Sequence, residues 1–380
     1  MAERIKIGLI YEYNENWIGG TYYTENIIHA LNSLIDSVKP EIYIFTPDDK
    51  SYERLVATIP YPYIKRGQYP YFNVFEKIVN KIVRSVAGRN LLNKNLSELK
   101  FIGLNPPQFF LDCQVYWIPD FQDLYFPEFF SFEEKKYRLN THLNLQKFKR
   151  RVIFSSQSSK RDFLKHYPAA KSKIYVLPFA VTHPEFQSLD IENIRSLYQL
   201  PERYFFCPNQ FWIHKNHILI LKAIKILKEK GINVFVAFSG KEYEYRAPDH
   251  FNFLLRYVEE NNLSDNVKFL GFIDRRHQLR LMKDSLSIIQ PSLFEGWSTV
   301  VEDAKAINQF IIASDIDVHR EQLKDNCDFF NPIDEHSLVK SIELVLNKNS
   351  ENNFVNYEQQ VNQFGLNFLS MIEDISGRKF

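Results

Sequence analysis

The residues best suited to chemistry gather between positions 289 and 306, where Glu295 precedes a turn and Asp303 follows eight residues later. The apolar run before them predicts a short buried strand that stops at Pro291. Gly296 permits a sharp turn or a close approach of the backbone to a ligand. This stretch therefore predicts the end of a strand, a tight turn and the start of a helix.

The start of that helix has the features of an anion site. Thr299 and Glu302 match a capping box, which predicts that the helix begins at Thr299 and gives Glu302 a structural role. Unpaired N–H groups and the helix dipole favour an anion there, and Ser292, Ser298 and Thr299 offer hydrogen bonds to a phosphate. Two carboxylates beside such a site suit a ligand that carries both phosphates and hydroxyls, as a nucleotide-sugar does.

The same stretch resembles the donor-site signature of the retaining group 1 glycosyltransferases, which belong to glycosyltransferase family 4 and have the GT-B fold. That signature places two glutamates on either side of seven residues, and here Glu295 and the one-methylene-shorter Asp303 have this spacing. The resemblance implies that the intervening Gly296 and Trp297 also line the donor site. Glu302 becomes the second acid if the alignment slips by one residue. The alternative without function is a surface helix start with two unrelated acids.

A second donor-site element follows the strand expected at 204–207. In the family that the chain resembles, this loop carries an Arg and a Lys six residues apart, which grip the donor diphosphate. Lys215 matches the Lys and suits a phosphate leaving group as a point charge. Asn209 stands where the Arg is usual, so half of that charge is missing. His214 and His217 have no third ligand spaced with them, and neither a metal nor a cofactor is expected.

The N-terminal residues predict the opening of a doubly wound α/β domain. A strand at 5–11 is followed by a polar loop that ends in Gly19 and Gly20, and then by a helix at 21–34. The full GxGxxG pattern is absent, so the dinucleotide signal is weak. The resemblance implies a Gly-Gly loop near the donor phosphates and the acceptor, whereas the alternative is an ordinary turn between strand and helix.

Asp120 is the candidate catalytic residue of the first half of the chain. It follows a strand expected at 114–118, where the family often has an active-site His that is absent here. Asp120 or Asp123 is expected to bind acceptor or sugar hydroxyls, or to act as a base toward the acceptor. The alternative is that these aspartates only form the turn.

Length and patterning predict two domains rather than one. A chain of 380 residues exceeds one ordinary core, and alternating strands and helices predict mostly parallel sheets. The resemblance implies an α/β GT-B fold, in which two Rossmann-like doubly wound domains face each other across a cleft. Residues 1–180 would be the acceptor-binding domain and 201–350 the nucleotide-sugar domain, with a helix at about 360–380 packing back on the first.

Residues 61–94 combine seven basic residues, a single acid and several aromatic side chains. From Phe72 onward, apolar residues recur at helical spacing, and Lys77, Lys81 and Arg84 lie largely off that stripe. A basic amphipathic helix with aromatic residues at its boundary suits an anionic membrane surface. The alternative is a helix that faces the core with a solvated basic side.

These features favour an enzyme that transfers a sugar, with retention, from a nucleotide-sugar to a hydroxyl of a glycan or lipid-linked glycan, in bacterial surface polysaccharide biosynthesis. The alternatives are a GT-B sugar-nucleotide epimerase and a non-catalytic nucleotide-sugar-binding subunit. A net charge of +1 does not indicate nucleic acid as a partner. Three widely spaced cysteines, and no signal peptide or spanning run, predict the cytoplasm, with the inner membrane face as the place of contact.

Overall fold

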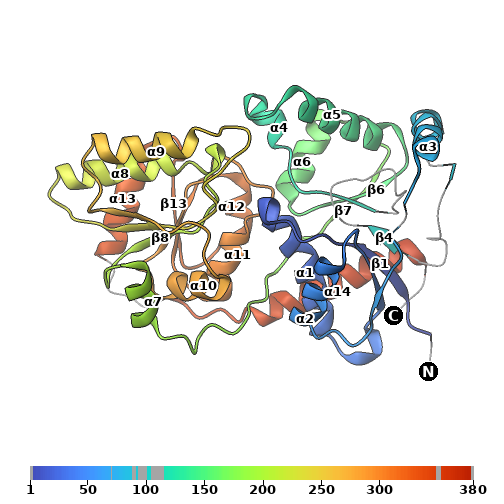
Figure 1. Ribbon diagram of the computed structural model, residues 1–380, viewed down its shortest axis with the longest axis horizontal. Helices are drawn as coiled ribbons and strands as arrows, with labels where there is room; N and C mark the ends of the chain where they lie inside the picture. Colours follow the sequence, from blue (N-terminus) through green and yellow to red (C-terminus); the bar gives the residue numbers. More distant parts are fainter. Residues whose placement is uncertain are drawn as a thin grey trace. The chain divides into compact units, whose positions relative to one another are not determined.

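Figure 1 shows the computed structural model of the chain, which describes residues 3–69, 71–87, 91–92, 101–103, 115–347 and 352–377. The chain forms two compact units. Unit 1 contains Met1–Phe121, Phe132–Thr182 and Glu358–Phe380, and unit 2 contains Gln122–Ser131 and His183–Tyr357. Residues 122–131 and 183–200 therefore belong to the same unit as the expected nucleotide-sugar domain.

Unit 2 is built on one parallel sheet, in which the strands follow the order β10-β9-β8-β11-β12-β13. Its strands are β8 (Phe205–Cys207), β9 (Val236–Phe238), β10 (Val267–Phe269), β11 (Ile288–Gln290), β12 (Ile311–Ser314) and β13 (Cys327–Phe330). Counted along the unit, this is the 3-2-1-4-5-6 order of a doubly wound sheet. The chain reverses its winding direction between the neighbouring strands β8 and β11, and ligands bind at the carboxyl ends of strands at such a point.

Helices cover both faces of this sheet and produce two apolar cores. Side chains of α8 (His217–Glu229), α9 (His250–Glu260) and α13 (Glu335–Leu346) fill one core. Side chains of α7 (Ile191–Tyr198), α10 (Arg275–Asp284) and α11 (Thr299–Ala306) fill the other. Because both faces are covered, the central strands β8, β9 and β11 are apolar up to the Gln290 that ends β11, and this polar residue stands out. The remaining short elements of unit 2 are α4 (Gln122–Tyr125), η4 (Pro127–Phe129), η5 (Ile213–Lys215) and α12 (Asp317–Gln322).

Unit 1 has two parallel sheets among its described residues, ordered β3-β2-β1-β4 and β5-β6-β7. The strands are β1 (Lys6–Ile10), β2 (Glu41–Phe45), β3 (Ile64–Arg66), β4 (Phe101–Gly103), β5 (Tyr116–Ile118), β6 (Arg151–Phe154) and β7 (Lys173–Val176). The helices are η1 (Glu15–Trp17), α1 (Ile18–Asn32), η2 (Asp36–Val38), α2 (Asp49–Thr58), α3 (Val74–Ala87), α5 (Phe132–Lys147), α6 (Gln157–His166) and α14 (Glu358–Ser376).

The last helix, α14, packs on α1 although more than 300 residues separate them (Figure 1). The two backbones approach closely, since a Cβ atom on Gly365 would lie 2.6 Å from the carbonyl oxygen of Ala30. Ser33 Oγ also donates a hydrogen bond to Asn362 Oδ1, at 2.6 Å. A glycine at this crossing lets the two helices meet at backbone distance.

Several sequence expectations need correction. Gly19 and Gly20 do not end a loop but lie in the first turn of α1, which begins at Ile18. The Trp17 indole fills the space that a Cβ on Gly20 would take, so packing explains that glycine. Residues 180–200 are not only a connector, because they contain α7. The expected strand at 114–118 begins at a residue outside the described ranges. The basic residues Arg89 and Lys94 also lie outside these ranges.

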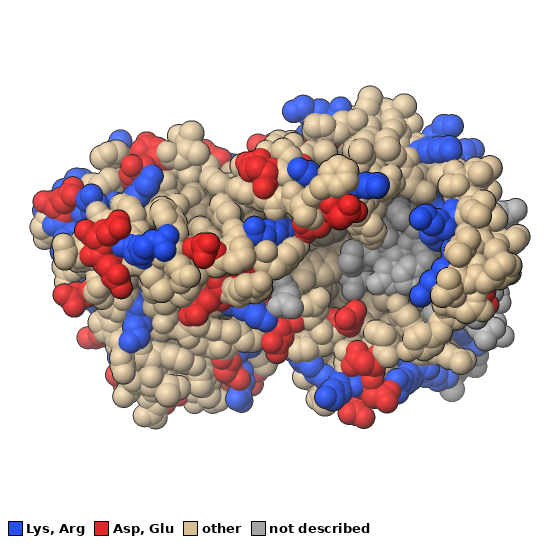
Figure 2. Space-filling model, turned by 45° about the horizontal axis from the view of Figure 1, so that its top comes forward, with Lys and Arg blue, Asp and Glu red and all other residues tan. Residues whose placement is uncertain are grey.

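Charge is mixed over the surface. On the face shown in Figure 2, Lys and Arg side chains are interspersed with Asp and Glu. This distribution agrees with the net charge of +1. Within the described ranges, every helix is too short or too polar to span a bilayer.

Candidate active site

Polar side chains follow the carboxyl ends of β8 and β11, the two strands at the switch point of unit 2. Asn209 comes two residues after β8, and Gln290 is the last residue of β11. Both side chains are buried, with 4% and 0% of their surface exposed. The sequence thus places amides where an open α/β sheet binds ligands.

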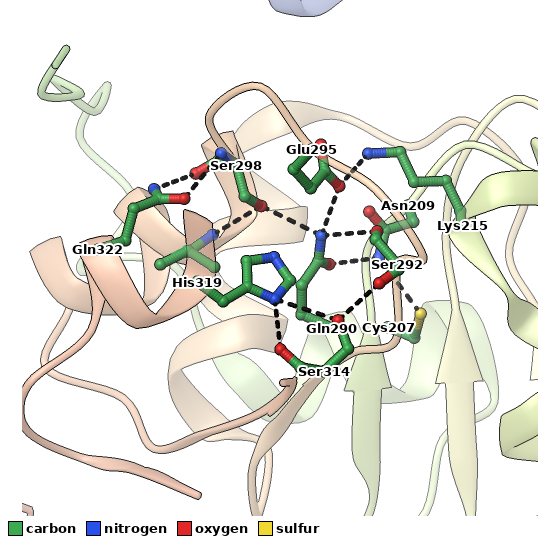
Figure 3. A network of polar contacts seen from close by, with 11 residues as sticks. Cys207, Asn209, Lys215, Gln290, Ser292, Glu295, Ser298, Ser314, His319 and Gln322 are labelled. Atoms are coloured by element: carbon green, nitrogen blue, oxygen red, sulfur yellow. Dashed lines mark hydrogen bonds and ion pairs between the residues drawn. The ribbon is translucent and has the colours of Figure 1, made fainter. Parts of the chain in front are cut away.

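Lys215 and Glu295 form an ion pair at this position (Figure 3). Lys215 Nζ lies 2.5 Å from Glu295 Oε1, and the two side chains are 15% and 10% exposed. Lys215 ends η5, and the carboxylate of Glu244 accepts a hydrogen bond from the backbone N–H of Ile213 in the same turn, at 2.9 Å. The two residues that the sequence singled out, 80 positions apart, are therefore in direct contact.

Gln290 is the centre of the network beneath this pair (Figure 3). Its Nε2 lies 2.9 Å from Glu295 Oε1 and 3.1 Å from both Ser292 Oγ and Ser298 Oγ. Its Oε1 accepts a hydrogen bond from Asn209 Nδ2, at 2.7 Å. Sequence reasoning missed Gln290, although a glutamine that ends an apolar strand before Pro291 was a usable signal.

The helix after the turn begins at Thr299 as predicted, but the capping-box prediction is wrong. Ser298 is the N-cap, and its hydroxyl accepts a hydrogen bond from Val301 N, at 3.4 Å. With this cap, Val301 occupies the third helical position, which Glu302 would have to fill to complete the box. Glu302 is instead buried, and accepts hydrogen bonds from Gln322 Nε2 and Lys305 Nζ, both at 2.9 Å, and from Tyr357 at 2.6 Å.

Asp303 is a buried carboxylate with two cationic or donating partners. Arg275 Nη2 lies 2.5 Å and His183 Nε2 2.8 Å from its Oδ1, and the Asp303 side chain is 2% exposed. Burial by itself would raise the pKa of Asp303, but Arg275 and His183 outweigh it and hold the pKa below its usual value. Asp303 is therefore ionised. Its position is fixed by Arg275 of α10 and by His183, the first residue of the segment 183–357 of unit 2.

His319 is a buried histidine beside this network, in the stretch 317–321 to which sequence reasoning gave no role. Its Nδ1 lies 2.9 Å from the carbonyl oxygen of Ser314, which can only accept, so Nδ1 carries the proton. Burial lowers the pKa of His319, which keeps the ring neutral and leaves Nε2 as an acceptor. Among the described residues, Nε2 has no hydrogen-bond partner.

The other predicted residues have diverse surroundings. Asp120 lies in unit 1, where Arg138 Nη1 of α5 donates to its Oδ1 at 2.9 Å. Asp123 is buried in α4, within unit 2. Trp297 is half-buried and Gly296 is buried, on the loop between Glu295 and the Ser298 cap.

Aromatic contacts hold residues 122–131 to the loop that carries Glu295. The rings of Tyr125 and Phe294 have centroids 5.2 Å apart, and Phe126 contacts Phe294 from the side. The Arg246 guanidinium lies 4.4 Å above the centroid of Phe130. Within the ranges that the structure describes, no group of three or more His, Cys, Asp or Glu side chains is arranged to hold a metal.

Comparison with known sequences identifies the family of this site. Residues 190–361, which contain Lys215 and Glu295, match the family described as "Glycosyl transferases group 1". Over 235 residues the chain is 27% identical to the O-antigen chain mannosyltransferase RfbU of Salmonella typhimurium. The aligned part is 60% of this chain and 61% of RfbU, less than two thirds of that relative. Residues 190–361 thus match the group 1 glycosyltransferases, the family that the donor-site signature resembles.

Comparison with solved structures identifies the fold. A glycosyltransferase from Rickettsia africae has a TM-score of 0.66 at 14% identity, covering 98% of both chains. HepE of Anabaena, in complex with UDP and glucose, has a TM-score of 0.62 at 16% identity, covering 98% of this chain and 97% of HepE. The lipopolysaccharide glycosyltransferase WaaG has 0.57 at 12% identity, covering 99% of this chain and 96% of WaaG. The predicted α/β GT-B fold, with two Rossmann-like domains, is confirmed.

Proposed function

We propose that this protein is a glycosyltransferase that moves a sugar from a nucleotide-sugar to a hydroxyl of a glycan or lipid-linked glycan, in surface polysaccharide biosynthesis. The Lys215–Glu295 pair carries the proposal, because it lies at the switch point of a sheet whose sequence matches the group 1 glycosyltransferases. Two similar proteins support it: RfbU is an O-antigen chain mannosyltransferase, and the structure of HepE is a complex with UDP and glucose.

In this proposal, Lys215 changes partner when the donor binds. A diphosphate brings oxygen anions to the ammonium group, which is a compact charge suited to phosphate. Glu295 is then free to accept hydrogen bonds from sugar hydroxyls, while Gln290 continues to hold it. The N–H groups at the start of α11, near Thr299, stabilise the charge that grows on the departing diphosphate.

The proposal places the nucleotide ribose at Asp303 and the acceptor near Asp120. Asp303 is ionised, so its oxygens accept hydrogen bonds from ribose hydroxyls without a preceding loss of a proton. Asp120 would bind acceptor hydroxyls or receive a proton, with Arg138 fixing its carboxylate. The proposal requires neither a cofactor nor a metal, because the nucleotide-sugar is itself a substrate and Lys215 supplies positive charge to its diphosphate.

The proposed stereochemical course is retention by a front-face route. Double displacement needs a carboxylate nucleophile on the sugar face opposite the leaving group. Asp303 and Asp120 are each engaged in an ion pair, and the proposal commits Glu295 to hydrogen bonds from sugar hydroxyls, so each of the three suits binding rather than nucleophilic attack. In the front-face route the departing phosphate oxygen accepts the acceptor's proton. An NMR spectrum of fresh product with an inverted anomeric centre would contradict retention, and a trapped sugar ester on Asp120 or Asp123 would contradict only the front-face route.

Incubation with labelled nucleotide-sugars and a lipid extract tests the activity. Labelled sugar in the lipid or glycan fraction supports the transferase. A changed sugar that stays on the nucleotide indicates an epimerase instead, and binding without any product indicates a non-catalytic subunit. A thermal-shift screen of nucleotide diphosphates and their sugars selects the donor first, because a ligand bound only by the folded state raises the apparent stability.

We also propose that α3 contacts the cytoplasmic face of the membrane, where a lipid-linked acceptor would lie. The apolar stripe of α3 faces solvent: Phe75, Ile78, Ile82 and Val86 are 72%, 52%, 61% and 75% exposed. The alternative of a core-facing apolar side is therefore wrong for these four side chains. The helix is held by its polar side, where buried Asn80 accepts hydrogen bonds from Leu91 N and Leu92 N, at 3.0 and 2.8 Å.

Exposed basic residues complement this apolar stripe. Lys77 and Lys81 are exposed on the same helix, and each lysine near an anionic surface adds about 1 kcal/mol of attraction that salt weakens. Flotation with vesicles that contain an anionic lipid should recover the protein, and recovery should fall as the salt concentration rises. Equal recovery with neutral and anionic vesicles, or no recovery with either, would contradict the proposal.

A further inference from the structure

The side chain of Asn209 has a role different from that of the cation whose place it takes. Asn209 is 4% exposed, and its Nδ2 lies 2.7 Å from Gln290 Oε1 and 3.5 Å from Cys207 Sγ. The amide therefore points into the network beneath the ion pair, toward Gln290 (Figure 3).

The two ends of the Gln290 amide are not equivalent in this network. Glu295 is a carboxylate paired with Lys215, and its oxygens accept hydrogen bonds, so it requires the Nε2 end of Gln290. Ser292 and Ser298 offer hydroxyls, which can donate or accept and so tolerate either end. Asn209 Nδ2 can only donate, so it requires the Oε1 end of Gln290. Turning both amides over would place Gln290 Oε1 against the Glu295 carboxylate, and repulsion disfavours that arrangement.

We propose that Asn209 is a positioning residue, which orients the Gln290 amide so that its Nε2 holds Glu295 against Lys215. Asn209 donates a hydrogen bond to Gln290, and Gln290 donates one to Glu295, which also accepts from Lys215. This chain of hydrogen bonds runs from the end of β8 to the turn after β11. Asn209 thus acts on the ion pair through another side chain, without contacting it. This inference rests on the proposed function only in assigning the ion pair to the donor site.

The proposal makes a prediction that reverses the usual ranking of substitutions. Asn209→Asp keeps the size of the side chain but, at pH 8, replaces its donor by an ionised acceptor, because the ordinary pKa of an aspartate is about 3.9. Gln290 must then turn its Nε2 toward position 209 and its Oε1 toward Glu295. Asn209→Leu removes the donor without forcing that turn. Asn209→Asp should therefore lower the unfolding midpoint more than Asn209→Leu. Because burial of the new charge adds to this difference, the double-mutant cycle with Glu295 is needed to test the orientation.

A double-mutant cycle tests the orientation directly. Glu295→Gln supplies a side chain that can donate to a reversed Gln290 amide, so the network can run in the opposite direction. In ligand-free protein at pH 8, N209D/E295Q should have a higher unfolding midpoint than N209D, and the two changes should couple. N209L/E295Q should show no such recovery relative to N209L. Additive effects in N209D/E295Q, or N209D milder than N209L, would overturn the proposal.

Nucleotide binding provides the functional readout. By calorimetry with UDP as the probe, Asn209→Asp should bind at least about tenfold more weakly than the unmodified protein, the scale of losing one hydrogen bond to a charged group. Unchanged UDP binding in N209D, where the unmodified protein binds UDP, would overturn the link to the donor site. If the unmodified protein fails to bind UDP or any other nucleotide diphosphate, the proposed function is wrong, and the ligand-free cycle still decides the role of Asn209.

Discussion

Two regions of the molecule reverse the usual distribution of polar and apolar side chains, and they do so in opposite ways. In unit 2, the polar residues Asn209, Gln290 and Asp303 are at most 4% exposed. In unit 1, Phe75 and Val86 of α3 are more than 70% exposed. A buried polar group costs stability unless hydrogen bonds inside the protein satisfy it, whereas an exposed apolar stripe gains only from a partner outside. Substitutions in the first region should therefore lower the free energy of unfolding substantially, whereas substitutions in the second should hardly change it.

The largest expected effect concerns Asp303, because its removal takes a buried carboxylate away from both Arg275 and His183. Asp303→Ala should lower the free energy of unfolding by about 3–5 kcal/mol, measured by urea denaturation. Asp315→Ala, which breaks an exposed pair with Arg320, is the matched control and should cost less than about 1 kcal/mol. A similar cost at both positions would remove the basis for treating the buried site as special.

Nucleotide affinity separates Asp303 from its neighbour. Glu302→Ala also empties a buried carboxylate position, so it controls for loss of stability. Asp303→Ala, or Asp303→Asn if the alanine variant fails to fold, should weaken nucleotide binding more than the corresponding change at Glu302. The opposite ranking would mean that the family signature aligns one residue earlier.

The next effect concerns turnover. Lys215→Ala and Glu295→Ala should each lower the turnover number by about 100-fold or more, which corresponds to about 2.7 kcal/mol of transition-state stabilisation. The exposed Lys222 of α8 is the control, and Lys222→Ala should retain full turnover. Undiminished rates in both site variants would contradict the assignment of the ion pair to the donor site.

Acid should weaken both units through buried histidines. Burial lowers the pKa of His217 in unit 2 and of His142 in unit 1 to about 3, below the ordinary value of 6.5. Between these values the unfolded chain binds protons that the folded protein excludes, so stability falls as the pH decreases below about 6.5 and is unaffected above it. The slope is at most about 1.4 kcal/mol per pH unit for each histidine.

Replacing one histidine isolates its contribution. His217 stacks on Phe211 with centroids 4.5 Å apart, and neither ring nitrogen has a partner among the described residues. His217→Phe keeps an aromatic ring and should flatten the dependence of the urea midpoint on pH between 4 and 6.5. An unchanged slope would show that His217 does not remain neutral in the folded protein.

The smallest effect on folding is expected on α3, because its apolar stripe is exposed. A substitution there should change only the binding to anionic vesicles. Phe75→Glu should leave the free energy of unfolding within about 0.5 kcal/mol of the original, since the side chain is 72% exposed. Recovery with anionic vesicles should fall about tenfold, because one aromatic side chain leaves the interface. Phe132→Glu alters a phenylalanine with the same exposure on α5 and should leave recovery unchanged. Equal losses for both variants would argue against a specific face.

The regular elements of unit 2 could be predicted because their patterns are unambiguous. The helix after Gly296 was expected to begin at Thr299, and the structure places its start there. In contrast, α5 carries mixed charged and apolar residues without a clear stripe, and only Thr141, His142 and Leu145 are buried on it. Sequence periodicity gives no signal for a helix with so small a buried face.

The site was predictable where it depends on residue type and spacing, and unpredictable where it depends on the fold. Glu295 and Lys215 could be named from a loop pattern, but their contact requires β8 and β11 to be neighbours, although 80 residues separate them. The same adjacency brings Asn209 to Gln290. The cap was missed because Ser298 and Thr299 are both suitable N-caps. The choice of Thr299 wrongly assigned Glu302 to a capping box.

The crossing of α14 and α1 at Gly365 has a consequence for synthesis on the ribosome. The chain finishes unit 2 before it makes α14, although α1 is among the first helices to be translated. The surface of α1 that Gly365 and its neighbours cover is therefore bare while all of residues 183–357 emerge. Domains generally fold as units as they are made, from the N-terminus onward. We therefore expect the later-made unit to complete its fold first, with the α14-facing surface of α1 exposed until residues 358–376 emerge.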